Sequence, residues 1–414
     1  MVNIEQTTLS NGLRVVIQPD HGVPLVGVSL IYDVGSRVET PGNSGFAHLV
    51  EHLMFQGSEH VAAGELVHRI EEWGGSVNGM TGSERTTYFH TLPSHQYRLG
   101  LWLEADRMRG LAVTDEAFER QRATVLAERL ERITNRPYGQ AAVRMSELSY
   151  ADFGYGHPVI GYREDLEAAA RPDVDRFQAA WYRPNNAVLA VVGDVEPAAA
   201  VDAVHALFAS IPAVQTPRPP QFSAAQRMTP VFETVRDRQA SLPAVFINHP
   251  VVPYGDPDFY VHEVIEALLF RGASSRLNRR LVMEERTALK VQGGYEAHRG
   301  PSVFSFFGVV SEGGTPRALS ESYAEELERL VAEPVSHDEL ERVHNRLRAG
   351  RLFGRQSAVN RANGLARSVL YHADARWEER YLERVSRVGP DDIRRVAARD
   401  FDPNATVTLE VLPA

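Results

Sequence analysis

Two segments of this 414-residue chain close with the same pattern, and the interval between them limits the folds that the chain can adopt. Residues 181–193 (WYRPNNAVLAVVG) and 400–411 (DFDPNATVTLEV) each place a Pro-Asn turn before a run rich in β-branched residues. Pro184 and Pro403 are 219 positions apart (403 − 184), and a Pro-Asp pair opens the helix-like segment that precedes each. A fixed period is the usual sign of an internal repeat. Convergent use of one turn before a final strand is the alternative, but two matched features favour a chain built from two similar halves.

The strand and helix signals within each half predict an α+β fold. Runs rich in β-branched residues at 13–19 and 23–33 are typical of strands, and we expect the two to pair. Helical spacing of apolar residues covers 46–55, after a Gly/Asn/Ser-rich bend. Further elements expected in the first half are helices at 64–73, 96–109 and 114–132 and a strand at 86–91. The second half restarts with a strand at 243–251 and helices at 258–270 and 276–286. Each half is therefore expected to be an antiparallel sheet packed with helices.

A proline-rich segment separates the two halves. Residues 211–222 (IPAVQTPRPPQF) hold four prolines, which neither a helix nor a central strand accommodates. Such a segment stiffens into an extended linker. The chain is also too long for one ordinary core. We therefore place an N-terminal domain at residues 1–212, a linker at 213–224 and a C-terminal domain at 225–414.

Composition excludes several classes of site and partner. The absence of cysteine excludes disulfide scaffolds, cysteine-ligated metals and thiol nucleophiles, so any metal site must use His and carboxylates. Lys+Arg number 44 and Asp+Glu number 54, which gives a net charge of −10, and the arginines are scattered among acids. An acidic chain without a basic stripe argues against nucleic acid and anionic membranes as partners.

The sequence also bears on location. No segment approaches the roughly 18 apolar residues that a membrane-spanning helix needs. Residues 1–10 (MVNIEQTTLS) lack the basic and apolar regions of a signal peptide. We expect a cytoplasmic protein, or a periplasmic or exported one if a signal peptide was removed ahead of residue 1.

The strongest local signal is the pentapeptide His48-Leu49-Val50-Glu51-His52. On a helix, residues four apart lie on one face, so His48 and His52 can offer two imidazoles to one metal ion. Glu51 can then reach a water at the metal without ligating the ion. Catalytic zinc sites take three protein ligands and keep one position open, and this residue order is the inverzincin signature. The alternative is that these polar residues merely decorate a helix, but the apolar neighbours place them against a core, where unpaired polar groups are costly.

A zinc site requires a third ligand from elsewhere in the same half. The candidates are the acidic residues of the helix expected at 114–132, namely Glu116, Glu119, Glu128 and Glu131. Glu116 and Glu119 lie in the first turns, where acids are expected because of the helix dipole. Glu128 follows a Val-Leu-Ala run that should face inward. We therefore choose Glu128 as the third ligand.

These motifs resemble those of the M16 family of zinc metallopeptidases, and the chain length matches its M16B subfamily. The family pattern is His-x-x-Glu-His, the inverted zinc motif, followed by a glutamate about 75 to 77 residues on; here the interval from His52 to Glu128 is 76 (128 − 52). Further matches are FQGS at 55–58, GGSVNGMTGSERTTY at 74–88 and HPVIG at 157–161. The resemblance spans nearly the whole chain and implies the M16/LuxS-like metallohydrolase fold, with two homologous α+β halves of which the second lacks a zinc motif.

The resemblance assigns roles to individual residues. It implies that His48, His52 and Glu128 bind Zn²⁺ and that Glu51 is the general base, taking a proton from the attacking water and passing it to the leaving amine. Asn78 resembles a residue that holds the substrate backbone as an added strand, a mode of binding that reads main chain rather than side chains. A turn residue is the equally weighted alternative for Asn78.

Two departures from the family pattern bear on partners. Family members often carry a second glutamate seven residues before the ligand, and Gln121 occupies that position here, which alters any tuning of the metal ligands through it. Active members also use an Arg and a Tyr in the second half of the unit that faces the zinc, and our alignment places Val282 and Leu289 there. We therefore expect a heterodimer with a second M16-like subunit that supplies the Arg/Tyr pair; a homodimer is the alternative.

Two functions follow from these expectations. The first is a zinc metalloendopeptidase subunit that hydrolyses extended peptides or presequences inside a two-lobed chamber. The alternative is a non-catalytic, M16-like structural subunit of a larger complex. The intact zinc motif favours the first, because a scaffold has no need to keep Glu51 and all three ligands. The physiological peptide and the cleavage specificity do not follow from the sequence.

Overall fold

The computed structural model describes residues 3–218, 220 and 229–414 and divides the chain into two compact units. The first unit comprises Met1–Ala127, Pro158–Pro220 and Arg351–Arg380, and the second comprises Glu128–His157, Gln221–Gly350 and Tyr381–Ala414. The linker expected at 213–224 lies partly outside the described residues. The domain ranges 1–212 and 225–414 stay predictions.

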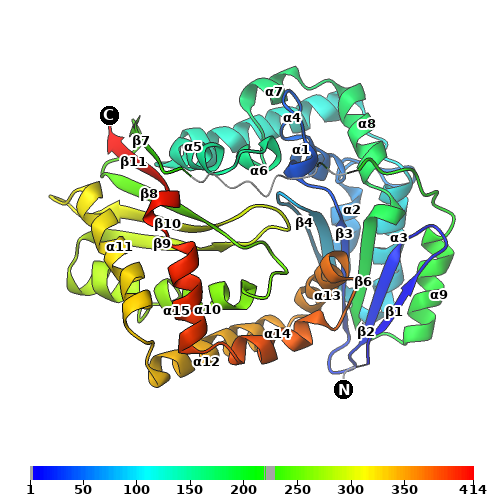
Figure 1. Ribbon diagram of the computed structural model, residues 1–414. Helices are drawn as coiled ribbons and strands as arrows, with labels where there is room; N and C mark the ends of the chain where they lie inside the picture. The colour runs from blue at the N-terminus through cyan, green and yellow to red at the C-terminus, as the bar shows by residue number, and fades with distance from the viewer. Residues whose placement is uncertain (1–2, 219, 221–228) are drawn as a thin grey trace. The chain divides into compact units, whose positions relative to one another are not determined.

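A six-stranded mixed sheet forms the centre of the first unit. Its strands follow the order β1-β2-β6-β3-β5-β4. Their bounds are β1 Glu5–Thr8, β2 Arg14–Pro19, β3 Leu25–Tyr32, β4 Ser76–Thr81, β5 Thr86–Pro93 and β6 Ala187–Gly193. The first unit also contains helices α1 Phe46–Leu53, α2 Glu65–Glu72, α3 Tyr97–Arg109, α7 Arg163–Ala168, α8 Arg171–Trp181, α9 Pro197–Phe208 and α13 Ala358–His372, with α4 Asp115–Arg129 extending from it (Figure 1).

The second unit repeats this strand order around a five-stranded sheet, β7-β11-β8-β10-β9. Its strands are β7 Val231–Asp237, β8 Ala244–Val251, β9 Ala288–Glu296, β10 Ser302–Val310 and β11 Val407–Pro413. Its helices include α5 Gly139–Ser149, α6 Phe153–Gly156, α10 Phe259–Leu269, α11 Pro316–Ala332 and α15 Pro390–Asp400, while α12 His337–Gly354 and α14 Trp377–Ser386 cross its limits. The two similar α+β halves predicted from the sequence repeat are confirmed.

The pairing expected between residues 13–19 and 23–33 is wrong. β6 lies between β2 and β3, parallel to β2 and antiparallel to β3. The second sheet has the same arrangement, because β11 is parallel to β7 and antiparallel to β8. Thus the repeated segment that closes each half becomes a central strand, buried on both faces in the case of β6. A wholly buried strand must be apolar on both sides, and the Ala-Val-Leu-Ala-Val-Val run of β6 meets that requirement.

Each sheet is covered on one face by a helix from the other half of the sequence. In the first unit α13 packs on β3 and β6, where Ala362, Ala366 and Val369 contact Ile31 and Val188 (Figure 1). In the second unit α5 packs on β8 and β11, burying Ala141 and Met145 against Leu409 and Val411. Because β6 and β11 occupy the same place in the strand order, α13 and α5 play equivalent roles.

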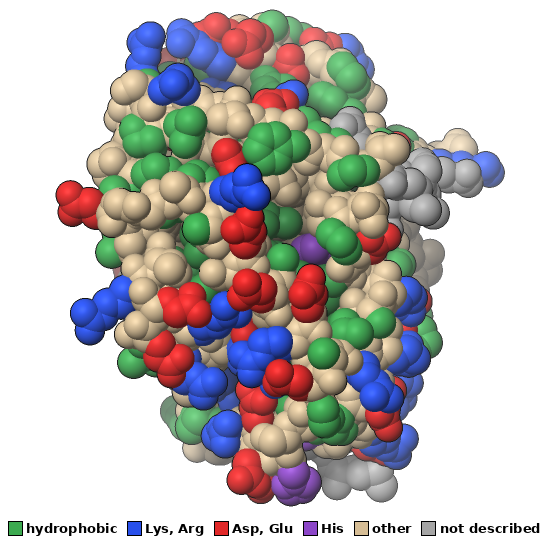
Figure 2. Space-filling view, turned by 60° about the vertical axis from the view of Figure 1, so that its left-hand side comes forward, with side chains coloured by type: hydrophobic (Ala, Val, Ile, Leu, Met, Phe, Trp, Pro, Cys, Tyr) green, Lys and Arg blue, Asp and Glu red, His purple; other side chains and the backbone are tan. Residues whose placement is uncertain are grey.

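The surface is charged but mixed in sign. Many arginines pair with acids one helical turn away, as Arg317 does with Glu321 and Arg163 with Glu167. On the face drawn in Figure 2, acidic and basic side chains are interspersed. No helix within the described residues is both long enough and apolar enough to cross a membrane.

Candidate metal centre

Helix α1 carries the two histidines, and the local sequence fixes where it begins. Gly45 precedes the helix with φ 86°, a left-handed conformation that glycine adopts without strain. The buried carboxylate of Glu39 caps the start, because its two oxygens accept hydrogen bonds from the backbone N–H groups of Gly45 (2.8 Å) and Ala47 (2.7 Å). Leu49 and Val50 are fully buried in the core beneath. The helix is therefore held at its end and along its apolar face.

The structure brings His48, His52 and Glu128 together. One ligand atom from each lies within 4.8 Å of the others. The two imidazole rings meet edge to face, with ring centroids 4.8 Å apart and an interplanar angle of 70°. Glu128 lies on the last turn of α4, so the helix that begins in the first unit delivers it. The third ligand chosen from the acids of this helix is thus the one adjacent to both histidines.

The donor set of this cluster fits a catalytic zinc ion. Zinc binds imidazole nitrogen and carboxylate oxygen at roughly 2.0–2.2 Å, and catalytic sites take three such ligands. Three donors that lie within 4.8 Å of one another can reach those distances with small side-chain movements. His48 is buried, and Glu128 has an 18% exposed side chain that pairs with Arg132 at 2.9 Å. The combination of two imidazole nitrogens and one carboxylate suits a divalent cation.

Glu51 is held beside the cluster by strand β4. The hydroxyl of Thr81 donates a hydrogen bond of 2.5 Å to the Glu51 carboxylate. Gly79, two residues earlier on the same strand face, leaves room for that carboxylate, because a Cβ at Gly79 would lie 3.1 Å from its Oε1. Neither Thr81 nor Gly79 was identified from the sequence, because only the packing of β4 against α1 reveals their contacts with Glu51.

Gln121 contacts one of the ligand candidates. Its side-chain oxygen lies 3.3 Å from Nδ1 of His52, so Nδ1 can donate to it and Nε2 is left to bind a metal. Gln121 and Glu128 are seven residues apart on α4 and therefore share a helix face. Gln121, which stands where family members often carry a glutamate, is thus in direct contact with the candidate metal ligand His52.

Asn78 lies on β4 but on the opposite face from Thr81. The strand alternates, with Ser76, Asn78 and Met80 exposed and the intervening residues partly buried. The Asn78 side chain accepts a hydrogen bond from the N–H of Gly79 (2.9 Å). Because β4 is the last strand of its sheet, one of its edges has no strand neighbour among the described residues.

Val282 and Leu289 belong to the second unit. Val282 lies in the π-helical segment Asn278–Glu284, and Leu289 is 64% exposed on β9, the last strand of the second sheet. β9 occupies the place in its sheet that β4 occupies in the first. His262 of the second unit is buried and hydrogen-bonded to Asp400 at 2.8 Å, so it serves as a core residue.

A buried ionic group beside the rings of Phe55 and Tyr88 was missed by sequence reasoning. Arg107 is fully buried, pairs with Glu104 at 2.5 Å, and lies 4.1 Å from the ring centroid of Tyr88 and 5.5 Å from that of Phe55. Burial alone would raise the pKa of Glu104, but the charge of Arg107 and a hydrogen bond with His90 outweigh it and lower that pKa. The only sequence signal was an acid and an arginine three residues apart on an apolar helix.

A second cluster, of Glu59, His60 and Asp106, has a structural explanation. Buried Asp106 accepts hydrogen bonds from the Ser58 hydroxyl (2.6 Å), the His60 N–H (3.0 Å) and the His60 ring (2.7 Å). The carboxylate of Asp106 therefore holds the loop that follows α1 through these hydrogen bonds.

Comparison with known proteins places these features in a family. The family model described as "Insulinase (Peptidase family M16)" matches residues 14–153, and "Peptidase M16 inactive domain" matches residues 169–347. The first match contains the clustered residues, and the second covers most of the repeat that lacks the histidine motif.

Individual relatives agree with both matches. "Zinc protease PqqE" of Helicobacter pylori is 28% identical over 99% of this chain and 93% of its own length. "Mitochondrial-processing peptidase subunit beta" of Dictyostelium discoideum is 24% identical over 97% of this chain and 87% of its own. The crystal structure of a protease from Helicobacter pylori superposes with a TM-score of 0.95 at 26% identity and covers all of both chains. From the two family models, the relatives and the shared fold, the chain belongs to peptidase family M16.

Proposed function

We propose that this chain is the catalytic subunit of a zinc-dependent endopeptidase that hydrolyses extended peptides. The observation that carries the proposal is the cluster of His48, His52 and Glu128 within 4.8 Å, with Glu51 on the same helix as the histidines. Relatives named as zinc proteases support the same activity. A non-catalytic structural role would leave this combination without a purpose.

The residues divide the work of peptide hydrolysis. His48, His52 and Glu128 would hold the zinc, which when bound polarises the scissile carbonyl and lowers the pKa of a water molecule. Glu51, positioned by Thr81, takes a proton from the attacking water and returns it to the leaving nitrogen. Gln121 accepts from His52 and fixes which ring nitrogen faces the metal.

The open edge of β4 supports an extended peptide as the substrate. A peptide that pairs with this edge is read through its main chain, so varied sequences can bind provided that they are unfolded. Asn78 would act there through its place on the edge strand rather than by facing Glu51. The net charge of −10 favours basic segments such as presequences.

Two measurements test the catalytic proposal. Wild-type protein should bind one zinc per chain, and Glu51→Gln should keep that zinc while losing peptidase activity by at least about 100-fold, a typical contribution of a general base. Glu71→Gln, the same change at an exposed position of α2, should affect neither property. Full activity in Glu51→Gln would disprove the assigned role, and a chain without stoichiometric zinc would favour the structural alternative.

We further propose that a second M16-like subunit completes the active enzyme. Val282 and Leu289 stand where the resemblance expects an Arg and a Tyr, and neither side chain can donate a hydrogen bond to a substrate. Relatives named as mitochondrial-processing peptidase subunits support an assembly of several chains. The purified chain should therefore bind zinc but cleave an unfolded peptide poorly until an M16-like chain carrying the Arg/Tyr pair is added. Full activity of the chain alone would contradict this.

A further inference from the structure

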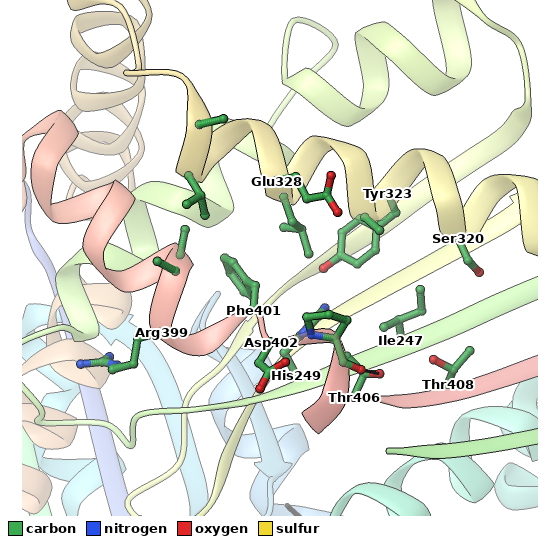
Figure 3. Close-up of a pocket in the computed structure, with 17 residues that line it drawn as sticks. Ile247, His249, Ser320, Tyr323, Glu328, Arg399, Phe401, Asp402, Thr406 and Thr408 are labelled. Atoms are coloured by element: carbon green, nitrogen blue, oxygen red, sulfur yellow. Dashed lines mark hydrogen bonds between the residues drawn. The ribbon is translucent and has the colours of Figure 1, made fainter. Parts of the chain in front are cut away.

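A pocket of about 610 Å³ lies wholly within the second unit, and none of the residues that line it belongs to the metal centre (Figure 3). Its floor is the face of β8 that presents Ile247 and His249, beside Thr408 of the neighbouring strand β11. One wall is α11, whose residues Tyr323 and Leu327 lie four apart on one helix face. The end of α15 and the following Phe401 form the other wall.

Small side chains explain why this space is not filled. Ala324 and Ala332 on α11 and Ala397 and Ala398 on α15 line the pocket where larger residues would close it. α11 and α15 pack on each other and both contact β8, so the walls belong to regular, packed elements. A volume of this size lies within the range of about 300–1,000 Å³ found for small-molecule sites.

Two buried polar side chains lie at the wall of this otherwise largely apolar space. His249 is 3% exposed and Tyr323 is 1% exposed. Among the described residues, no protein group makes a hydrogen bond to either ring nitrogen of His249 or to the hydroxyl of Tyr323. Their ring centroids are 5.9 Å apart, and the Tyr323 hydroxyl is directed toward the imidazole (Figure 3). Buried polar groups are normally paired, so an unpaired donor and acceptor at the wall of a cavity indicate that something else supplies the partners.

The buried end of the pocket carries no charge near neutral pH. Burial lowers the pKa of His249 to about 4, so its imidazole is neutral, with one nitrogen that donates and one that accepts. Burial also raises the pKa of Tyr323, which keeps its hydroxyl protonated. The charged groups that line the pocket are Glu328, Arg399 and Asp402. Of these, Arg399 is paired with Asp258 and Asp400. Neither His249 nor Tyr323 can therefore supply a counter-charge to an ionised ligand group.

We propose that this pocket binds a neutral small molecule with an apolar body and one buried hydroxyl or primary amide, held between Tyr323 and His249. Such a group both donates and accepts, which matches the phenol and the neutral imidazole. The apolar body would contact Ile247, Leu327 and Phe401. The site is independent of the metal centre in its residues and in its chemistry.

Matched aromatic probes test the proposal on the full-length chain. Calorimetric titration should give binding of 1-naphthol about tenfold tighter than binding of naphthalene, which lacks the hydroxyl, because one hydrogen bond between neutral groups contributes about that factor. The anion 1-naphthoate should bind more weakly than 1-naphthol. Equal affinities for 1-naphthol and naphthalene, or no binding of either, would overturn the proposal.

Two substitutions locate the binding. Tyr323→Phe should remove most of the preference for 1-naphthol over naphthalene, whereas Tyr138→Phe, the same change outside the pocket, should preserve it. Ala324→Phe, at an exposed position on the pocket wall, should abolish binding of both probes without lowering Tm. Unchanged binding in both pocket variants would refute the site.

The unliganded protein provides a separate check. If the Tyr323 hydroxyl has no partner within the protein, Tyr323→Phe should leave Tm unchanged or raise it. A clear fall in Tm, or a crystal structure with only ordered water bridging Tyr323 and His249 in the presence of 1-naphthol, would assign these groups a structural role and end the proposal.

Discussion

The side chain of Gln121 determines how His52 presents its ring to a metal. Gln121→Leu removes the acceptor for Nδ1–H of His52, so the ring loses its fixed orientation. We expect zinc affinity to fall by about 10- to 100-fold, the usual effect of losing such a partner. Chelator competition measures this, and Gln239→Leu, the same change in an exposed turn, should have no effect. Gln121→Glu should at least preserve affinity, because a carboxylate is a stronger acceptor. Identical affinities in Gln121→Leu and wild type would show that this contact does not orient the ring.

His249 should make stability depend on pH below neutrality. Its pKa is lowered from 6.5 to about 4 in the folded protein, so between these values the unfolded chain binds more protons. Stability therefore falls as the pH drops from 6.5 to about 4, by roughly 3 kcal/mol in total at 1.36 kcal/mol per pKa unit. His249→Phe should flatten this part of the profile, which denaturant unfolding at successive pH values measures. The same slope in both proteins would show that other groups cause it.

At the residue scale, sequence reasoning located side chains that a short motif or a fixed interval identifies. His48, Glu51 and His52 form one such motif, and Glu128 follows from its apolar surroundings and its distance along the chain. Thr81, Gly79 and Glu39 could not be found in this way, because each acts through a contact between segments that only the tertiary fold brings together. His249 and Tyr323 likewise become notable only once their surroundings are known.

At the scale of elements, the start of α1 links the stability of the fold to the metal centre. Glu39→Ala removes both hydrogen bonds to the first N–H groups of the helix and should lower the free energy of unfolding by about 1–2 kcal/mol. Because α1 carries both histidines, zinc affinity should fall as well. Denaturant unfolding and chelator competition measure the two effects, and Glu72→Ala, an exposed acid on α2, is the matched control. Equal stability of Glu39→Ala and the control would show that the cap is dispensable.

Most of the expected helices and strands formed within a few residues of their predicted bounds, but their neighbours in the sheets were not anticipated, and elements such as α5, α13, β4 and β9 were not predicted. Local apolar periodicity identified β2, β3, α3 and α10, since this pattern depends only on which side of an element is buried. The insertion of β6 between β2 and β3 depends on contacts more than 150 residues apart in sequence (Val188 and Arg14 differ by 174). Residues 276–286 were expected to be helical, and much of this segment forms the π-helical turn Asn278–Glu284, a distinction that periodicity does not resolve.

At the scale of the whole molecule, α13 should stabilise the first unit, although it comes from the second half of the sequence. Ala366 is fully buried between α13 and the first sheet. Ala366→Asp places a carboxylate there and should destabilise the first unit by roughly 3 kcal/mol or more, with loss of zinc binding. Asn360→Asp, at an exposed position of the same helix, should have little effect. Thermal unfolding with and without zinc measures the change, and a wild-type Tm for Ala366→Asp would show that α13 is not an essential cover.

The late position of α13 in the sequence also affects folding during synthesis. The chain is made from its N-terminus, and domains generally fold as they emerge. Here the apolar face formed by Ile31, Val188 and Val192 is complete once residue 193 has been made, yet the helix that covers it ends at His372. For the time taken to synthesise roughly 180 further residues, at about 5–20 residues per second, this face must remain uncovered or be shielded by a chaperone. The nascent chain should therefore depend on chaperones until translation is nearly finished.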